Sequence, residues 1–450
     1  MSTRRYAVVG GGITGLAAAW ELTRIAPDDE IVVYEPGALG GKLRTGRFAG
    51  RLVDEGADAF LARVPWGREL CDELGLGDEL VSPATPVAYV AAGTALHRLP
   101  PGLVLGVPTD PDALRGSPLV GPEAVERVAA EPALPGAPLA AGEDPSIGAL
   151  VRSRLGDDIL EHLVDPLLGG INAGDSDRLS VRAAAPQLAA AAERSASLVA
   201  GLRAAPPPDD PTAPVFWALP GGMSALVETL VGALADAGVA FTSEAVVDCR
   251  DLGADGVVLA APAAATAGIV ERAGAADAAA LLRNLGHSSP VLTTLAFARA
   301  DVEHPLDGSG FLVPRREGRF VTACSFATTK WSHLGTADAT TVVLRASAGR
   351  YGDDRAIDLD DDALLAATLA DLDDLLSLKG EATEVRISRW RDGFPQYEPG
   401  HLERVAAIEA DVAHHLPGVA VAGASYRGLG IPACIRQGRQ ASGQVAVKFP

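Results

Sequence analysis

The sequence predicts an α/β protein (α+β overall) in which a Rossmann-like parallel sheet carries an inserted second domain. Three observations support this. A short apolar strand at residues 6–9 runs into a glycine turn and a helical pattern through residue 24. A second strand at 30–35 follows and ends in an acidic residue, which completes a βαβ unit. The chain has 450 residues, enough for two or three folding units.

The balance of charge restricts the partners of the protein. The chain carries 38 basic and 58 acidic side chains, a net charge of −20, and has no block of Lys or Arg that offsets it locally. A chain of this charge repels phosphate backbones. Nucleic acid is therefore excluded as a main partner.

The cysteines and the N-terminus indicate a cytoplasmic protein. The four cysteines are widely spaced without a C-x-x-C pair, so reduced, buried thiols are expected. Arg4 and Arg5 lead directly into the first strand, without the apolar segment of a signal peptide. The longest apolar candidate, 257–270, is interrupted by Pro262, so no transmembrane segment is predicted. Peripheral contact with a membrane stays open.

The glycine turn has the spacing of a dinucleotide-binding site. The first glycine permits a tight turn, the second lets the backbone approach a pyrophosphate, and the third allows the helix to pack against the strand. The helix N-terminus directs free N–H groups at the anion, and the acid about 20 residues later accepts hydrogen bonds from a ribose. The predicted contacts are Gly10, Gly11, Gly12, Thr14, Gly15 and Glu35.

A second glycine pair favours FAD over NAD as the dinucleotide. Gly40 and Gly41 expose further backbone N–H groups, and Lys42 adds positive charge for a pyrophosphate. Residues 54–58, which include Gly56 and Ala57, follow with the sequence Asp-Glu-Gly-Ala-Asp. This arrangement resembles the FAD-binding start of the amine-oxidase-like flavoproteins. FAD is therefore the expected cofactor.

The middle of the chain predicts a domain boundary and a return to the FAD domain. Residues 204–214 contain three consecutive prolines and are expected to form an extended linker. A helix is expected at 224–237, and a strand-like return is expected to begin at Val246. In the FAD domains that this region resembles, a strand valine touches the adenine, so Val246 or Val247 is assigned to that contact, with a plain core valine as the alternative.

Four further stretches resemble one family, the oxygen-dependent porphyrinogen oxidases of haem synthesis. They lie in the same order and spacing along almost the whole chain, at 165–180, 310–315, 390–401 and 423–437. The last stretch reads as a buried strand, a glycine loop and a helix whose N-terminus suits the flavin edge that becomes anionic on reduction. The resemblance assigns Trp390, Gly423, Gly428, Ile431 and Pro432 to the flavin.

The resemblance implies oxidation of a porphyrinogen by O2 with release of H2O2, in three two-electron steps that the flavin carries. No catalytic residue is nominated, because no His or carboxylate cluster supports one. The histidines lack metal-ligand spacing and no G-x-S-x-G elbow follows a strand, so metal binding and serine hydrolysis are not expected. The arginines of 314–319 could pair substrate carboxylates, although solvation is the preferred reading for most of them.

The charge of the substrate separates two candidates. Coproporphyrinogen III carries four propionates and protoporphyrinogen IX two, and an acidic chain without a basic membrane-facing helix favours the first. Protoporphyrinogen IX oxidation remains the alternative. An amine oxidase, a carotenoid desaturase and a non-redox escort protein on the same fold are further alternatives. Transfer of the product to a ferrochelatase and the oligomeric state stay open.

The expected domains are discontinuous. The FAD domain is assigned to 1–80, 212–290 and 385–450, a helical lobe that faces substrate or membrane to 81–211, and a substrate-binding β-sheet lobe to 291–384. In the last lobe, strands are expected at 319–326 and 341–345 and a helix at 361–378.

Overall fold

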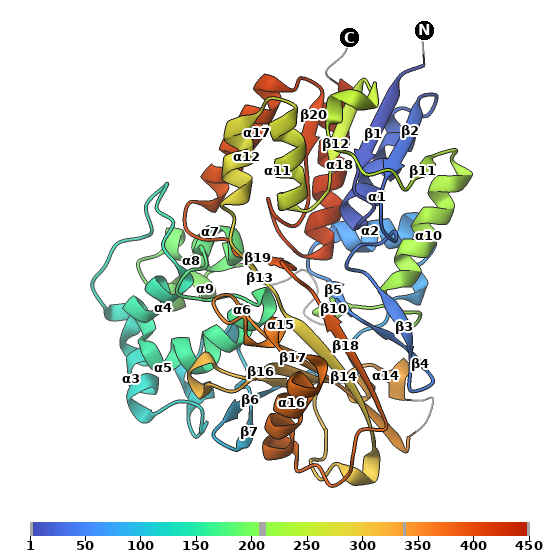
Figure 1. Cartoon of the computed structure of the whole chain (residues 1–450). Helices are drawn as coiled ribbons and strands as arrows, with labels where there is room; N and C mark the ends of the chain where they lie inside the picture. The colour runs from blue at the N-terminus through green and yellow to red at the C-terminus, as the bar shows by residue number, and fades with distance from the viewer. Residues whose placement is uncertain (1–2, 207–212, 336–338, 448–450) are drawn as a thin grey trace.

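The computed structural model describes residues 3–206, 213–335 and 339–447. A five-stranded parallel sheet lies at the end of the molecule that carries both termini (Figure 1). In spatial order its strands are β11 (Ala240–Thr242), β2 (Glu30–Tyr34), β1 (Arg5–Val9), β12 (Gly256–Leu259) and β20 (Val419–Val421). Segments from both ends and the middle of the chain thus share one sheet.

Both faces of this sheet are buried, because side chains of a strand alternate between its faces. Tyr6 and Val8 of β1 join one apolar cluster, and Ala7 and Val9 join the other. The first cluster is covered by α1 (Ile13–Ile25), α2 (Pro65–Glu73), α10 (Met223–Asp236) and α18 (Ile431–Val447). The second is covered by α11 (Ala263–Arg272), α12 (Ala276–Arg283) and α17 (His401–His415). This three-layer arrangement confirms the predicted α/β fold.

A second, seven-stranded sheet lies at the opposite end of the molecule (Figure 1). Its spatial order is β18 (Glu384–Arg389), β14 (Val291–Ala298), β17 (Thr341–Ala348), β16 (Val321–Phe326), β15 (Gly310–Leu312), β6 (Tyr89–Ala92) and β7 (Ala95–Arg98). Neighbours are antiparallel except β15 and β6, which are parallel. Helix α16 (Asp361–Leu376) packs Leu372, Leu375 and Leu376 into the core of this sheet.

Short strand pairs and helices complete the two sheet regions. Three antiparallel pairs are β3 (Thr45–Phe48) with β4 (Arg51–Asp54), β5 (Phe60–Leu61) with β10 (Phe216–Trp217), and β13 (His287–Ser288) with β19 (Phe394–Pro395). The short helices beside the large sheet are α13 (Ala327–Lys330), α14 (Ser332–Gly335) and α15 (Arg355–Asp358).

The β6–β7 hairpin lies within residues 81–211, the span predicted for the helical lobe, but it belongs to the large sheet. Strand β6 pairs with β15 and extends that sheet. The reason is a pairing between segments more than two hundred residues apart, in which Tyr89 lies opposite Phe311. Such long-range pairing leaves no local signal in the sequence. The predicted linker at 204–214 falls largely on 207–212, which lie outside the described residues.

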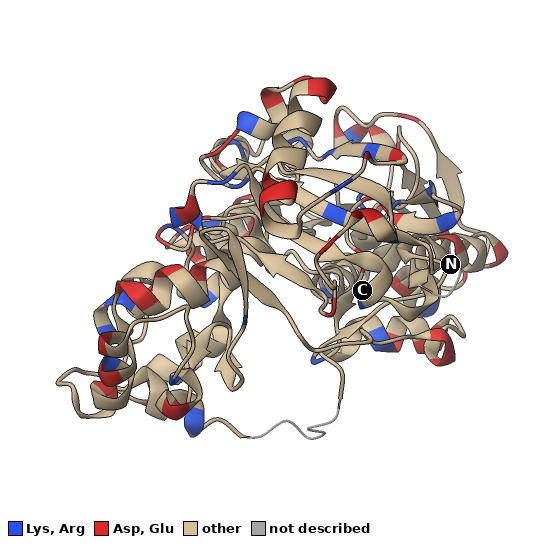
Figure 2. Ribbon diagram, turned by 90° about the horizontal axis from the view of Figure 1, so that it is seen from below, with Lys and Arg blue, Asp and Glu red and all other residues tan. Residues whose placement is uncertain are grey.

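The helical lobe has its own apolar core. Its elements are β8 (Leu103–Val104), β9 (Val107–Pro108), α3 (Pro122–Ala130), α4 (Ile147–Leu155), α5 (Asp157–Ile159), a π-helical segment at Leu160–Val164, α6 (Asp165–Asn172), α7 (Val181–Ala184), α8 (Pro186–Arg194) and α9 (Leu198–Arg203). Viewed from below, acidic and basic residues lie interspersed along the outer helices (Figure 2).

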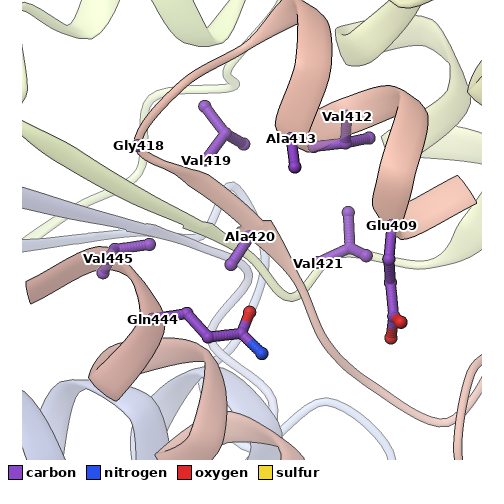
Figure 3. Close-up of a pocket in the computed structure, with 9 residues that line it drawn as sticks. All are labelled: Glu409, Val412, Ala413, Gly418, Val419, Ala420, Val421, Gln444 and Val445. Carbon is purple, nitrogen blue, oxygen red and sulfur yellow. The ribbon is translucent and has the colours of Figure 1, made fainter. Parts of the chain in front are cut away.

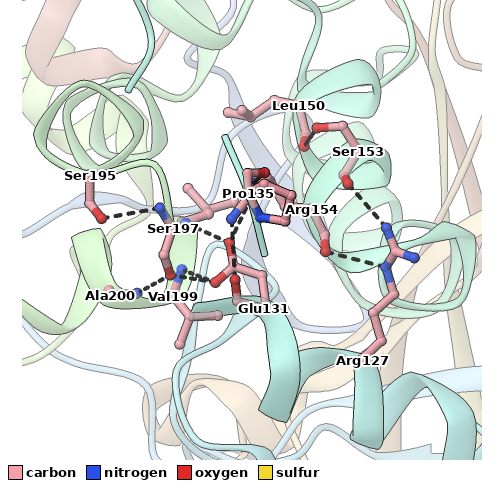
Figure 4. Close-up of polar contacts among 11 residues, drawn as sticks. Arg127, Glu131, Pro135, Leu150, Ser153, Arg154, Ser195, Ser197, Val199 and Ala200 are labelled. Atoms are coloured by element: carbon pink, nitrogen blue, oxygen red, sulfur yellow. Dashed lines mark hydrogen bonds and ion pairs between the residues drawn. The ribbon is translucent and has the colours of Figure 1, made fainter. Parts of the chain in front are cut away.

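A buried carboxylate fixes the helical lobe internally (Figure 4). Glu131 is fully buried and accepts hydrogen bonds from Arg154 Nε at 2.8 Å and from the Leu198 N–H at 2.8 Å. The Val199 N–H and the Ser197 hydroxyl also donate to it. The carboxylate therefore caps the N-terminus of α9 while pairing with α4, which satisfies a charge that would otherwise be costly to bury.

In the part of the chain that the structure describes, no helix combines the length and the apolar character needed to cross a membrane.

Candidate functional site

Two of the three motif glycines are required by the packing of the protein itself. Gly10 has φ +111°, and a Cβ there would lie 2.7 Å from the carbonyl carbon of Ala260. A Cβ on Gly15 would lie 1.8 Å from the Gly10 carbonyl oxygen. Both positions therefore exclude larger residues, because any side-chain atom there would collide with backbone atoms.

Gly12 differs, because nothing within 4 Å would meet a Cβ on it. It is the N-terminal cap of α1, with no side-chain cap and no acidic residue in the first turn. The first N–H groups of this helix are thus left for an external acceptor. The open space at Gly12 is what a dinucleotide pyrophosphate requires, so these residues fit the predicted cofactor.

Glu35 ties the glycine turn to the loop that follows β2. One carboxylate oxygen accepts the Gly11 N–H and the other accepts the Gly37 N–H, each at 2.8 Å. The side chain also explains Gly11, where a Cβ would lie 2.8 Å from the Glu35 Cβ. Each oxygen retains a further lone pair. The ribose contact expected of Glu35 remains a prediction.

The second glycine pair lies directly against the first turn. The Gly40 N–H donates to the Gly11 carbonyl at 2.8 Å, and a Cβ on Gly41 would lie 3.3 Å from the Gly12 Cα. Both residues have positive φ, +98° and +60°. The structure therefore brings together two glycine loops that the sequence separates by about 30 residues.

Lys42 contacts the turn that follows Trp390. Its ammonium donates to the Gly393 carbonyl, in the turn that follows Trp390, and burial lowers its pKa. Arg44 stays closer, with Nε 3.1 Å from the Gly41 carbonyl and its guanidinium 5.4 Å from the centre of the Trp390 ring. The positive charge expected of Lys42 is thus directed to the 390–393 turn.

The loop with Gly56 and Ala57 is held from two sides. Trp390 Nε1 donates to the Glu55 carbonyl at 2.9 Å, and Arg345 of β17 donates to the Gly56 carbonyl. A Cβ on Gly56 would lie 2.6 Å from the Lys42 carbonyl oxygen, whereas Ala57 is exposed. Trp390 and Lys42, which were both predicted to contact the cofactor, therefore both contact this loop.

Asp58 and Asp54 flank that loop and have opposite pKa shifts. Asp58 accepts Lys330 at 2.9 Å and Arg345 at 3.0 Å, and although burial alone would raise its pKa, these cations hold it below the usual range. Burial raises the pKa of Asp54 to about 6, against hydrogen bonds from Thr45 at 2.6 Å and the Met223 N–H at 2.8 Å. Neither role was predicted from the sequence.

The C-terminal glycine loop joins the same site through α18. A Cβ on Gly438 of this helix would lie 2.2 Å from the Thr14 carbonyl oxygen, so α18 crosses α1 at close range. Gly423 has φ +136° and lies beside the Thr14 side chain. The helix then begins at Ile431, and Ile431 and Ile13 belong to one apolar cluster. The N-termini of both helices therefore belong to one region of the molecule.

Three residues that the sequence left without a role hold this loop in place. Tyr397 donates to the Ala424 carbonyl and accepts the Gly428 N–H at 3.1 Å. His401 stacks on Tyr397 with 4.1 Å between ring centres, and its Nε2 lies 2.7 Å from the Tyr426 carbonyl oxygen. Gln437 donates to the Gly428 carbonyl at 3.0 Å. Their role depends on contacts between distant segments.

The expected strand at Val246 is wrong. The chain forms β11 before this residue and β12 after it, and Val246 lies in the connection between them. Its side chain is half-buried against the cluster beneath α11 and α12, whereas Val247 is 53% exposed. The pair of valines suggested a strand, but the connection does not pair with the sheet. The adenine contact of Val246 stays a prediction.

A small apolar pocket between α17, β20 and α18 is not the cofactor site (Figure 3). Its volume is about 40 Å³, far below the several hundred Å³ of a cofactor pocket. Its one acid, Glu409, already pairs with Arg427 at 2.8 Å. Among the described residues, no group of three or more His, Cys, Asp or Glu side chains is arranged to hold a metal ion.

The arginines of the predicted hairpin separate into two groups. Arg316 pairs with Glu161 at 2.9 Å and Arg319 with Asp371 at 3.1 Å, at the turn between β15 and β16. Arg315 instead donates to the carbonyls of Gly174 and Tyr351. Two of the three therefore have carboxylate partners within the protein.

Known proteins resemble the chain over nearly its whole length. The family model described as flavin containing amine oxidoreductase matches residues 13–446. A coproporphyrinogen III oxidase from Bacillus subtilis (strain 168) is 32% identical over 97% of this chain and 97% of its own. One from Mycobacterium leprae (strain TN) is 37% identical, over 97% and 96%.

A solved structure extends the resemblance to three dimensions. A provisionally named protoporphyrinogen oxidase from Exiguobacterium sp. 255-15 superposes with a TM-score of 0.87 and 33% identity, over 100% of both chains.

Proposed function

The chain belongs to the flavin-containing amine oxidoreductase family and is an FAD-dependent oxidoreductase, and we propose that it oxidises coproporphyrinogen III to coproporphyrin III with O2. The observation that carries the substrate is the full-length identity to bacterial proteins named coproporphyrinogen III oxidase. In this reaction six hydrogens leave the macrocycle in three two-electron steps, and three O2 become three H2O2.

The protein contributes binding and orientation. Bound FAD supplies the acceptor for the two electrons of each step. The first-turn N–H groups of α1 and the space at Gly12 would hold its pyrophosphate, together with the neighbouring Gly40 and Gly41. The N–H groups at the N-terminus of α18, which begins at Ile431, would stabilise the flavin edge that gains negative charge on reduction.

Positioning of the flavin depends on side chains from both ends of the chain. Tyr397, His401 and Gln437 fix the loop that leads into α18, and Trp390 fixes the loop at Gly56. A fixed site keeps the reacting carbon of the substrate close to the acceptor and excludes water. No acid–base pair is needed for this role.

We also propose the cytoplasm as the compartment of the protein. All four cysteines are buried free thiols in the structure, which suits a reducing environment.

Aerobic turnover tests the proposal. The purified protein is incubated in air with coproporphyrinogen III and protoporphyrinogen IX in parallel, and porphyrin fluorescence and peroxide are recorded. The FAD-stripped protein in the same buffer is the control for autoxidation. We expect a flavin absorbance spectrum and faster formation of coproporphyrin than of protoporphyrin.

The other outcomes have definite meanings. Faster protoporphyrin formation would replace the substrate with the one named for the Exiguobacterium protein. Bound flavin without porphyrin formation from either substrate would reject porphyrinogen oxidation, and oxidation of an amine would then be the next activity to test.

A further inference from the structure

A cavity of about 450 Å³ opens between the β15–β16 turn and the loop that follows β17. Four arginines line it, Arg315 and Arg319 from the turn and Arg350 and Arg355 from the loop, together with Asp353 and Asp354. Arginine guanidinium groups bind carboxylates in a bidentate geometry, so such a lining suits an organic acid.

Two of these arginines are already neutralised. Arg355 pairs with Asp353 at 2.7 Å, and Arg319 with Asp371 at 3.1 Å. Arg316, in the same turn but outside the cavity lining, pairs with Glu161 at the surface. The arginines of the cavity without a carboxylate partner are therefore Arg315 and Arg350, and the carboxylate of Asp354 lines the same cavity.

Arg315 and Arg350 have no ion pair among the described residues. Arg315 donates only to two backbone carbonyls, at 3.1 and 3.2 Å, and its Nε is buried without a hydrogen-bond partner. Arg350 is 9% exposed, and its guanidinium has one long contact, 3.5 Å to the Val313 carbonyl. Donors of buried cations that lack acceptors are costly, and a bound anion would satisfy them.

The electrostatic setting of Arg350 agrees with this reading. Burial and the neighbouring charge of Arg315 lower its pKa, and the carboxylates of Asp165 and Asp353 act in the opposite direction without bonding to it. The buried guanidinium of Arg350 and the half-buried one of Arg315 thus lie near enough to repel each other. An anion between them would remove their mutual repulsion.

The cavity is connected to the candidate active site by direct contacts. Arg315 donates to the Gly174 carbonyl, and the Tyr351 N–H donates to the Ala173 carbonyl at 2.8 Å. The Gln396 side-chain amide donates to the carbonyl of the next residue, Asp175, at 3.5 Å. Gln396 directly precedes Tyr397, which holds the loop that leads into α18. The cavity therefore lies against the 172–175 turn, one contact away from the segment that positions the cofactor.

We propose that Arg315 and Arg350 form a carboxylate-binding subsite that holds a propionate of the tetrapyrrole substrate. This inference rests on the proposed function and adds to it the residues that select a substrate rich in carboxylates. Propionate binding here would orient the macrocycle from one edge.

Binding of the stable product tests the subsite without turnover. Coproporphyrin III and its uncharged tetramethyl ester are titrated into the holoprotein, and porphyrin fluorescence is recorded. We expect Arg315→Gln and Arg350→Gln each to weaken coproporphyrin III binding about 10-fold and to leave ester binding unchanged, as loss of a charge-assisted contact requires. Arg316→Gln, from the same turn, is the matched control and should stay within about twofold.

Each other result would overturn the subsite. Equal loss of acid and ester, full retention of coproporphyrin III affinity, or no binding to the wild-type protein would do so. Because Arg350 is buried, thermal melting is measured for every variant, and the half-buried Arg315 decides the question if Arg350→Gln unfolds. If coproporphyrin III binding depends on the arginines but coproporphyrinogen III is not turned over, the proposed function is rejected and the subsite is retained. If coproporphyrinogen III is turned over and Arg315→Gln binds coproporphyrin III as tightly as the wild type, the subsite is rejected and the proposed function is retained.

Discussion

The glycine loops at the five-stranded sheet and the arginine cavity at the seven-stranded sheet both offer donors to anions, but they are built from different parts of the chain. At Gly12 and Gly41 the donors are backbone N–H groups, and the residues contribute by lacking a side chain. At Arg315 and Arg350 the donors are guanidinium groups with few acceptors of their own. An added side-chain atom would therefore block ligand binding at the backbone site, whereas ligand binding at the arginine site depends on charge.

The largest expected effect is at Gly15. A Cβ there would lie 1.8 Å from the Gly10 carbonyl oxygen, and this backbone atom cannot rotate away as the end of a flexible side chain could. We expect Gly15→Ala to lose at least about 4 kcal/mol of stability, because α1 must shift from β1. Urea unfolding of the variant measures this. A stability equal to that of the wild-type protein would show that the turn can accommodate a Cβ beside the Gly10 carbonyl.

Asp58 tests the region where the two sheets meet through side chains. The Asp58 carboxylate joins Lys330 and Arg345, and Arg345 also holds the Gly56 carbonyl. Asp58→Asn would leave the buried Arg345 and the half-buried Lys330 without this counter-charge, so a loss of about 3 kcal/mol is expected at pH 7. Chemical denaturation with Asp72→Asn, an exposed ion pair, as control checks it. Equal losses in the two variants would contradict a buried role.

Gly12 sharpens the contrast with Gly15. Its Cβ would enter open space, so Gly12→Ala should fold with an unchanged apoprotein melting temperature. The added methyl group occupies the space predicted for the pyrophosphate, and a cost of about 2–3 kcal/mol weakens FAD binding about 100-fold. Titration of apoprotein with FAD measures it. Unchanged affinity would remove Gly12 from the cofactor site.

Asp54 gives the smallest effect, visible as a pH dependence. Its pKa in the folded protein, about 6, lies above the ordinary value of 3.8, so the folded state binds the proton more tightly. Its contribution to stability is therefore present below about pH 4 and is lost as the pH rises to about 6. Asp58 behaves oppositely, since its lowered pKa makes its contribution disappear as the pH falls below about 4.

Asp54→Asn isolates this dependence. The difference in unfolding free energy between wild type and variant should change by roughly 2 kcal/mol between pH 4 and 6.5, with the wild type losing stability relative to the variant as pH rises. Parallel urea titrations at both pH values measure it. A difference that is independent of pH would mean that Asp54 has an ordinary pKa.

The features predicted correctly from the sequence are those that depend on residues close together in the chain. The strand at 6–9, the helix after it and the helix at 361–378 are present with ends shifted by one or two residues, because periodicity and turn glycines are local signals. The family and its cofactor followed from motifs of the same kind. The glycines at 10–15 and 40–41 lie close together because they follow the carboxyl ends of β1 and β2, which are adjacent parallel strands.

The features that could not be predicted from the sequence depend on contacts between residues far apart in the chain. The hairpin at 89–98 joins a sheet made mostly of residues after 290, and Tyr397 acts on a loop some thirty residues later. Arg350 has no motif around it, and it becomes a candidate contact only where β17 ends beside Arg315. Val246 failed for the opposite reason, since a local apolar pair suggested a strand that the sheet does not use.

The most direct test of the contrast between the two sites is a crossed titration of FAD and coproporphyrin III into Gly12→Ala and Arg315→Gln. We expect Gly12→Ala to weaken FAD binding about 100-fold and Arg315→Gln to leave FAD affinity unchanged while weakening coproporphyrin III about 10-fold. Loss of FAD affinity in Arg315→Gln equal to that in Gly12→Ala, with no selective loss of coproporphyrin III, would contradict the division between a backbone-built cofactor site and a charge-built substrate site.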